Sequence, residues 1–301
     1  MAQTPSTTKL GLNQWNSNDP LNTAQFNEDN RIIDTQVTGL QNRADNIENE
    51  VTDLHDVVRS ANLIINGSLT VWQRGESFNV INTTGGVYTA DRLKCRRVGD
   101  VQVTVSRLSP DSGGMRITGS GQVEIRYIME LTDFSQIDGK NVALSYSRNG
   151  EVEEQTFVAN LQNCPIDGAG RRAFTITLTE CTIGWIKLEL GNVATPFVPR
   201  TTAEEFSLCQ RYYEESGSIR SVGQQQGGFW TNVVYNVTKR ATPNITLSSP
   251  VRVWVGSTIR EATAIQHMTP NTKGFGFTAI QPGPEVTIGF ALFSFTADAE
   301  L

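Results

Sequence analysis

The sequence predicts a mainly β protein in which an N-terminal coiled coil is followed by two β-sandwich modules, jelly-roll-like in pattern, that are joined by a short helix. Three observations support this fold class. Apolar residues follow a heptad repeat across residues 22–61, short segments of alternating apolar residues follow it, and a helix-capping pattern interrupts those segments near residue 201. A chain of 301 residues is long enough for two or three such modules.

Residues 22–61 carry the heptad repeat. A first apolar set, assigned to the d positions, recurs every seven residues at Phe26, Ile33, Leu40, Ile47, Leu54 and Ala61. The a positions between them are occupied by Asn30, Val37, Ala44, Val51 and Val58. Four heptads favour a coiled coil over the alternative, an amphipathic helix packed on its own globule. Val at a with Leu at d suits a dimer, whereas alternating Ile and Leu at d is compatible with a trimer, so the pattern leaves the strand number open.

Residues 62–199 predict the first β module. Apolar side chains alternate along five short segments, which are centred on Val103, Ile125, Leu144, Ile176 and Leu188. Such alternation places the apolar side chains on one face of each strand. The Asn-Gly and Asp-Gly pairs at 149–150 and 167–168 supply the turns that antiparallel hairpins need. Many short strands without helical segments between them indicate a β-sandwich or jelly roll.

Residues 200–301 predict a short helix followed by a second β module. Thr201 with Glu204 three residues later forms a capping-box pattern. We expect Phe206, Cys209 and Tyr213 to share one face of the helix that follows. Further alternating segments lie around residues 235, 253 and 288, and we interpret Gly274 and Gly276 as parts of turns or bulges.

Composition excludes several classes of function. The net charge of −6 argues against binding to nucleic acid or to an anionic bilayer, and no apolar run is long enough for membrane insertion. The four cysteines are far apart without a C-x-x-C pair, so we expect no disulfide framework and no metal site. Only two histidines are present, so few residues could take part in histidine-based catalysis. We also expect no cofactor.

Acidic pairs and aromatic residues are the candidate site residues. The pairs at 153–154, 204–205 and 214–215 are interpreted as solvated charge and not as the two carboxylates of a glycosidase, so we expect no catalytic residues and no enzyme. Sugar rings stack on aromatic side chains while neighbouring polar groups bind their hydroxyls. The candidate ligand-binding residues are Trp72, Tyr88, Asp91, Arg92, Trp230 and Trp254. The competing interpretation is that such aromatic residues belong to the core.

Residues 1–21 form a polar arm with little apolar periodicity. Its few anchors are Leu10, Leu12 and Trp15. Because so polar a segment buries little apolar surface, we expect it to order only against a partner.

Several segments resemble one protein family. The segments 62–75 (NLIINGSLTVWQRG) and 88–92 (YTADR) resemble the start of a β module that recurs in fibre and receptor-binding proteins of tailed bacteriophages. The end of that module is similar to three further segments, 184–191 (GWIKLELG), 194–200 (ATPFVPR) and 208–213 (LCQRYY). Segment 297–301 (ADAEL) is similar to the tail of the domain that often follows, and 21–34 (LNTAQFNEDNRIID) resembles the arm that joins such fibres to the virion.

The resemblance implies a homotrimeric fibre located in the virion and assembled in the cytoplasm of the bacterial host. Residues 1–21 would attach to other virion proteins, 22–61 would form a trimeric coiled coil, and the modules 62–199 and 200–301 would face host-surface polysaccharide. Two alternatives stay open. One is a head or neck (collar) fibre with a structural role and no specific ligand, and the less favoured one is a polysaccharide depolymerase.

Overall fold

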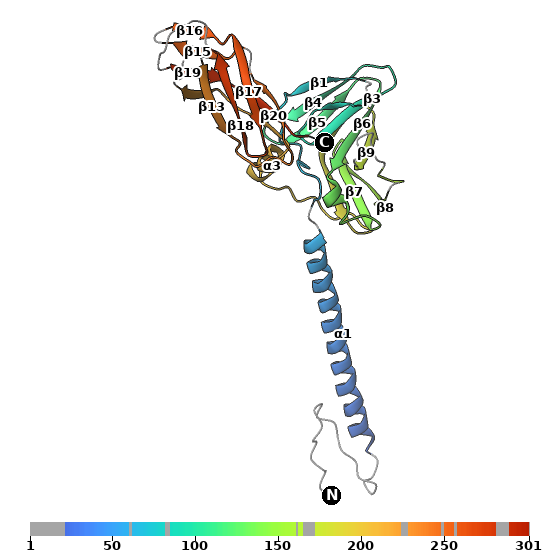
Figure 1. Cartoon of the computed structure of the whole chain (residues 1–301). Coiled ribbons are helices and arrows are strands. Elements are labelled where there is room, and N and C mark those ends of the chain that lie inside the picture. Colours follow the sequence, from blue (N-terminus) through green and yellow to red (C-terminus); the bar gives the residue numbers. More distant parts are fainter. Residues whose placement is uncertain are drawn as a thin grey trace. The chain divides into compact units, whose positions relative to one another are not determined.

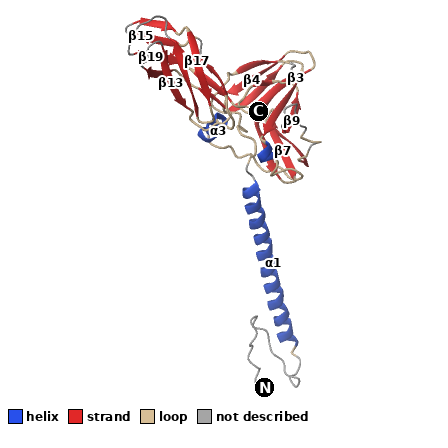
Figure 2. Ribbon diagram, viewed as in Figure 1, coloured by secondary structure: helices blue, strands red, loops and turns tan. Residues whose placement is uncertain are grey.

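The computed structural model describes residues 22–59, 62–81, 85–160, 162–164, 172–223, 228–247, 250–255, 258–280 and 289–300. The chain divides into two compact units, residues 1–59 and 60–301. The first contains one long helix, α1, and the second contains all the strands (Figures 1 and 2). The predicted mainly β architecture with few helices is confirmed.

Helix α1 spans Thr23–Arg59. It begins at the polar cap Asn22, whose Oδ1 accepts a hydrogen bond from the backbone N–H of Ala24 at 3.0 Å. Such a cap satisfies one of the N–H groups that have no partner within a helix. At about 1.5 Å per residue, these 37 residues extend for about 55 Å.

The N-terminal β module consists of two antiparallel sheets. The six-stranded sheet has the order β1 (Ser77–Val80), β4 (Val103–Ser109), β5 (Gly113–Thr118), β10 (Cys181–Leu190), β7 (Asn141–Arg148) and β8 (Glu151–Val158). The four-stranded sheet has the order β2 (Val87–Tyr88), β3 (Leu93–Val98), β6 (Gln122–Met129) and β9 (Arg172–Leu178). A short helix, α2 (Leu131–Phe134), follows β6. One hydrophobic core joins residues of both sheets, so the module has the layered build of a β-sandwich.

The C-terminal β module also surrounds one core. A three-stranded sheet has the order β11 (Tyr213–Glu215), β20 (Phe295–Asp298) and β14 (Asn244–Leu247). A four-stranded sheet has the order β12 (Ile219–Gly223), β19 (Gly289–Phe293), β15 (Arg252–Val255) and β16 (Thr258–Glu261). The third sheet has the order β13 (Gly228–Val234), β18 (Gly274–Ile280) and β17 (Ala264–Pro270). Aromatic residues from different sheets, including Phe229, Phe277 and Phe293, meet in the shared core.

The connecting helix α3 spans Thr202–Gln210, and its predicted cap is confirmed. The side chain of Thr201 accepts a hydrogen bond from the backbone N–H of Glu204 at 3.3 Å. The predicted apolar face is wrong, because the helix ends at Gln210 and Tyr213 begins strand β11. Cys209 is buried, whereas Phe206 is exposed.

Two further details differ from the sequence prediction. Gly274 and Gly276 lie inside strand β18 and not in a turn. A Cβ at Gly274 would lie 2.1 Å from the carbonyl oxygen of Val233, so the close approach of strand β13 requires glycine. The segment predicted to be centred on Val103 forms β4, which begins at Val103 because the preceding alternate residue, Val101, is exposed.

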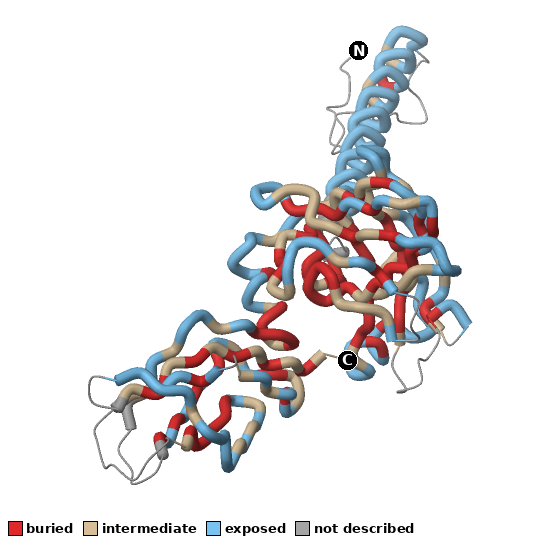
Figure 3. The backbone as a smooth tube through the Cα atoms, turned by 90° about the horizontal axis from the view of Figure 1, so that it is seen from above, coloured by how far each residue is buried: buried red, intermediate tan, exposed pale blue. Residues whose placement is uncertain are grey.

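Figure 3 shows where the buried residues lie. They are concentrated on the strands of the 60–301 unit, whereas α1 is drawn almost entirely as exposed. A single helix has no second layer against which to bury an apolar stripe. Most apolar side chains of α1 that the structure describes are therefore exposed in the isolated chain.

Candidate functional site

The predicted trimerisation residues form a row of exposed apolar side chains on α1, which we call the α1 seam. The seam includes Ile33 (40% exposed), Val37 (47%), Leu40 (62%), Ile47 (57%) and Val51 (58%), and the d-position residue Phe26 (56%) extends it toward the start of the helix. Ala44, the small a-position member between them, is also exposed. The side chains of Leu54 and Val58 lie outside the described residues. Repeated exposure at seven-residue spacing along one helix leaves an apolar surface that is suited to other helices.

The predicted attachment residues Leu10, Leu12 and Trp15 lie outside the described residues. Their role stays a prediction.

Trp72, Asp91 and Arg92 are corrections to the predicted ligand-binding set. All three are buried, with exposed fractions of 8%, 0% and 1%. The indole Nε1 of Trp72 donates a hydrogen bond to the carbonyl oxygen of Leu69 at 2.7 Å. A buried side chain whose polar atom already has a partner offers no stacking surface to a sugar, so these residues are structural.

Arg92 belongs to a buried ionic cluster between the two β modules, which we call the junction. Its guanidinium forms an ion pair with Glu300 and donates a hydrogen bond to the carbonyl oxygen of Ile128 at 2.7 Å. The guanidinium carbon also lies 3.5 Å from the ring centroid of Tyr212. The backbone of Arg92 has φ = 70°, a conformation that is uncommon for a bulky residue. These contacts offset the cost of holding Arg92 in that conformation.

Arg74 is the second cation of the junction. It lies 3.3 Å from a carboxylate oxygen of Asp91 and 3.5 Å from one of Glu300. Its guanidinium carbon is 3.6 Å from the ring centroid of Tyr213 and 4.9 Å from that of half-buried Tyr88. Tyr88, a predicted ligand-binding residue, therefore also contributes a ring to this junction.

Burial raises the pKa of Asp91 from its usual 3.8 to about 6, although Arg74 and the hydrogen bonds from Gln73 act in the opposite direction. The carboxylate is therefore ionised at neutral pH at a cost in folding free energy. Arg74 and Gln73 partly compensate this cost, because Arg74 lies 3.3 Å from the carboxylate and Gln73 donates hydrogen bonds to it.

The acidic pairs are not all solvated, which corrects the sequence prediction. Glu205 is 2% exposed and accepts a hydrogen bond from the backbone N–H of Asn66 at 2.6 Å. Glu214 is 2% exposed and lies 2.5 Å from the ammonium of Lys239. Each carboxylate holds one chain segment against another that is distant in sequence.

Four of the segments that carry the family resemblance meet in space at the junction. Arg74 comes from segment 62–75, Arg92 from 88–92, Tyr212 from 208–213 and Glu300 from 297–301. Arg74 and Glu300 were absent from the predicted site residues, although both lie within these quoted segments. These four segments therefore build the connection between the two modules.

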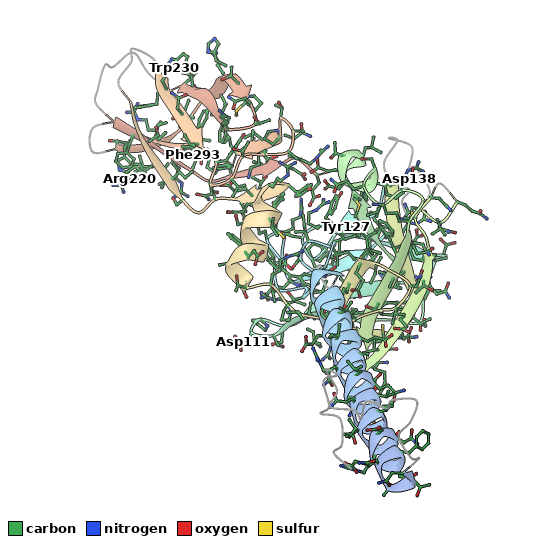
Figure 4. The ribbon with its side chains drawn as sticks, turned by 90° about the horizontal axis from the view of Figure 1, so that it is seen from below. Asp111, Tyr127, Asp138, Arg220, Trp230 and Phe293 are labelled. Atoms are coloured by element: carbon green, nitrogen blue, oxygen red, sulfur yellow. The ribbon has the colours of Figure 1, made fainter. Side chains whose placement is uncertain are left out.

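Trp230 and Trp254 lie at the surface of the C-terminal module on different sheets, Trp230 on strand β13 and Trp254 on strand β15. Trp254 is half-buried and stacks on Phe290 with 4.3 Å between ring centroids. Arg220 lies 4.3 Å from the centroid of the same Phe290 ring, so both ring faces of that residue are in contact. Trp230 is 55% exposed on strand β13. In Figure 4, Trp230 is labelled at the upper edge of this module and Arg220 at its lower left edge.

The cysteines are buried and unpaired, and burial raises the pKa of the Cys95 thiol to about 12. Within the described ranges, no cluster of three His, Cys, Asp or Glu side chains is arranged to hold a metal ion. No helix among the described residues has both the length and the apolarity to cross a bilayer. No family model, curated protein or solved structure matches the chain.

Proposed function

We propose that this chain is a structural fibre protein of a tailed bacteriophage, a receptor-binding tail fibre that works as a homotrimer. In this proposal residues 1–21 attach to other virion proteins, α1 trimerises, and the β modules bind host-surface polysaccharide. The protein is assembled in the host cytoplasm and then resides in the virion. The resemblance of the sequence segments supports the fibre class, and the exposed α1 seam is the observation that carries the oligomeric form.

The energetics of the α1 seam support an assembly of chains. Complete burial of a Val, Leu or Ile side chain stabilises by about 1.5–3 kcal/mol. Seam residues such as Leu40 and Ile47 retain more than half of their exposure in the single chain, at 62% and 57%. Covering each of them with neighbouring helices therefore contributes about 1 kcal/mol. Summed along the seam, this gain favours a bundle over an isolated helix.

The partners of two acidic residues favour a structural role for them over a catalytic one. Glu205 and Glu214 are engaged with buried partners. A glycosidase requires two accessible carboxylates on either side of a bound sugar. Carboxylates that are buried and paired in this way hold distant chain segments together.

Three copies on one stalk explain how weak sugar sites serve adhesion. Single sugar sites of millimolar affinity gain about 10²–10⁴ in avidity when several engage one surface together. The gain requires that the sites be linked, and in this proposal α1 supplies the link. The attachment stays reversible because each individual contact remains weak.

The test is the mass of the full chain by light scattering. We expect a trimer for the wild type and its loss in Leu40→Asp, because a carboxylate at a d position would be buried among apolar side chains. The matched control is Asn42→Asp, which adds the same charge at an f position two residues away, and this variant should remain a trimer. A monodisperse monomer for the wild type, or equal behaviour of the two variants, overturns the proposal.

A further inference from the structure

Strand β13 presents a second set of side chains to solvent, opposite to those that enter the core. Phe229 and Val233 belong to the core, so Trp230 and Asn232 face outward from the sheet. Both outward side chains are exposed. Trp230 has no ring contact with another described aromatic residue, in contrast to Trp254.

The central strand β18 carries only small residues on this outer face. Trp230 lies opposite Thr278, and Asn232 lies opposite Gly276. On the far side of β18, strand β17 places Gln266 beside Thr278 and Thr269 beside Gly276. We call these six residues the β18 strip: Trp230, Asn232, Gln266, Thr269, Gly276 and Thr278.

Polar groups from both neighbouring strands converge over Gly276. The amide oxygen of Asn232 and the hydroxyl oxygen of Thr269 lie 2.7 Å and 3.4 Å from the position that a Cβ would occupy there. The absence of a side chain at Gly276 therefore leaves an amide and a hydroxyl close together on the surface. The amide of Asn232 can donate and accept hydrogen bonds, and the Thr269 hydroxyl, which donates to the carbonyl oxygen of Gly276 at 3.4 Å, can still accept.

Thr278 adds an independent indication of a ligand. The residue is 5% exposed, and its Oγ1 has no hydrogen-bond partner among the described residues. A buried hydroxyl without a partner is unfavourable, and such groups in native proteins call for an explanation. Its position directly opposite the exposed indole of Trp230 places this hydroxyl in the same strip.

The chemistry of the β18 strip selects the class of ligand. None of its six residues is ionisable. The indole offers a flat apolar surface, and the amides and hydroxyls offer matched donors and acceptors, which together suit the apolar face and the hydroxyl groups of a sugar ring. An anionic sugar would instead require a cation such as Arg220. That residue lies on strand β12 of a different sheet and contacts Phe290.

We propose that the β18 strip is the glycan site of this chain and that it binds neutral sugars, hexose or N-acetylhexosamine units. This inference rests on the proposed adhesive function and names the ligand class and the residues. Trp230 stacks on the ring, and Asn232, Gln266 and Thr269 bind its hydroxyls. Trp254 does not take part, although its aromatic character made it a candidate.

The experiment titrates the full chain with a panel of neutral hexose and N-acetylhexosamine oligosaccharides, with polyuronic acids as anionic comparators. The wild type should bind at least one neutral oligosaccharide with little dependence on salt. Trp230→Ala removes the stacking surface, and Gly276→Val fills the strip while keeping the indole. Both should weaken binding by at least about tenfold, equivalent to about 1.4 kcal/mol. The matched control Trp254→Ala should change binding less than about twofold.

Several outcomes would overturn the β18 strip as a glycan site. They are binding to none of the neutral oligosaccharides, binding to the polyuronic acids alone, and a loss confined to Trp254→Ala. Light scattering on the same samples separates this failure from failure of the proposed fibre. A trimer without neutral-sugar binding removes only this site, and a trimer that dissociates in Trp230→Ala identifies the strip as a contact between chains.

Discussion

Helix α1 and the junction of the two β modules depart from the usual distribution of side chains in opposite directions. In α1, apolar residues such as Leu40 are exposed. In the junction, charged residues such as Arg92 and Asp91 are buried. Soluble proteins normally bury the first kind and expose the second.

The difference shows where each region finds its partners. The junction is satisfied within one chain, because Arg92 pairs with Glu300 and Arg74 with Asp91. The α1 seam has no such solution within the described part of its own helix. The buried ionic cluster connects segments of one chain, whereas we propose that the exposed apolar seam is a surface for further chains. Three predictions test this contrast, beginning with the largest effect.

Arg92→Met should strongly destabilise the 60–301 unit. Removing one partner of a buried ion pair leaves the other charge uncompensated and typically costs about 3–5 kcal/mol. We expect about 3 kcal/mol, the lower end, because Arg74 still lies 3.5 Å from Glu300. Urea unfolding of the full chain, followed by tryptophan fluorescence, measures the change.

The control for this prediction is Arg97→Met. Arg97 lies 3.9 Å from Asp100, whose side chain is 98% exposed. A pair of this kind contributes little, so the free energy of unfolding should change by less than about 0.5 kcal/mol. If the two variants lose equal stability, the junction is no stronger than a surface ion pair.

Dilution should affect the two regions differently. A bundle of α1 helices dissociates on unfolding, so each tenfold dilution costs about 1.4 kcal/mol for a dimer and about twice that for a trimer. The junction lies within one chain and should not respond. Thermal melting followed by circular dichroism at 222 nm should therefore show a helical transition that moves with concentration. The β transition should stay in place.

The size of the shift in the helical melting transition with concentration also gives the number of helices in the bundle. A helical transition that does not depend on concentration would mean that α1 is stable without partners. The contrast between the two regions would then be lost.

The pH dependence of stability should reveal the cost of burying Asp91. Its pKa of about 6 in the folded chain lies above its usual 3.8, so the folded protein holds the proton more tightly. Asp91 therefore contributes stability that is present below pH 4 and is lost as the pH rises through 6. The slope from this group is at most about 1.4 kcal/mol per pH unit.

The comparison variant for the pH measurement is Asp91→Asn, which cannot ionise. Free energies of unfolding from urea titrations between pH 4 and 7 should decline more steeply for the wild type than for the variant. Parallel pH profiles would show that the Asp91 carboxyl keeps its usual pKa in the folded chain.

Local patterns predicted the elements correctly where local chemistry decides them. The heptad repeat predicted α1, and Thr201 with Glu204 predicted the start of α3. Alternation predicted strands such as β6, whose residues Val123 and Ile125 are buried. Each of these signals depends on neighbours within a few residues, so one sequence contains it in full.

The same patterns failed where contacts between distant segments decide. Asp91 and Arg92 lie in a polar stretch that suggests a surface, but the carboxyl group of Glu300 reaches Arg92 across 208 residues. Gly276 was interpreted as a turn residue, although it lies in the central strand of a sheet. The β18 strip is assembled from three strands whose order along the sheet does not follow the sequence.

The sequence by itself determined the periodicities: a long helix with one apolar face, two groups of short strands, and a capped helix between them. Only the tertiary structure decided which charges are buried and which aromatic residues are exposed. The physical reason is distance. Periodicity is set by the geometry of a few successive residues, whereas burial depends on which remote strand lies alongside and what that strand offers as a partner.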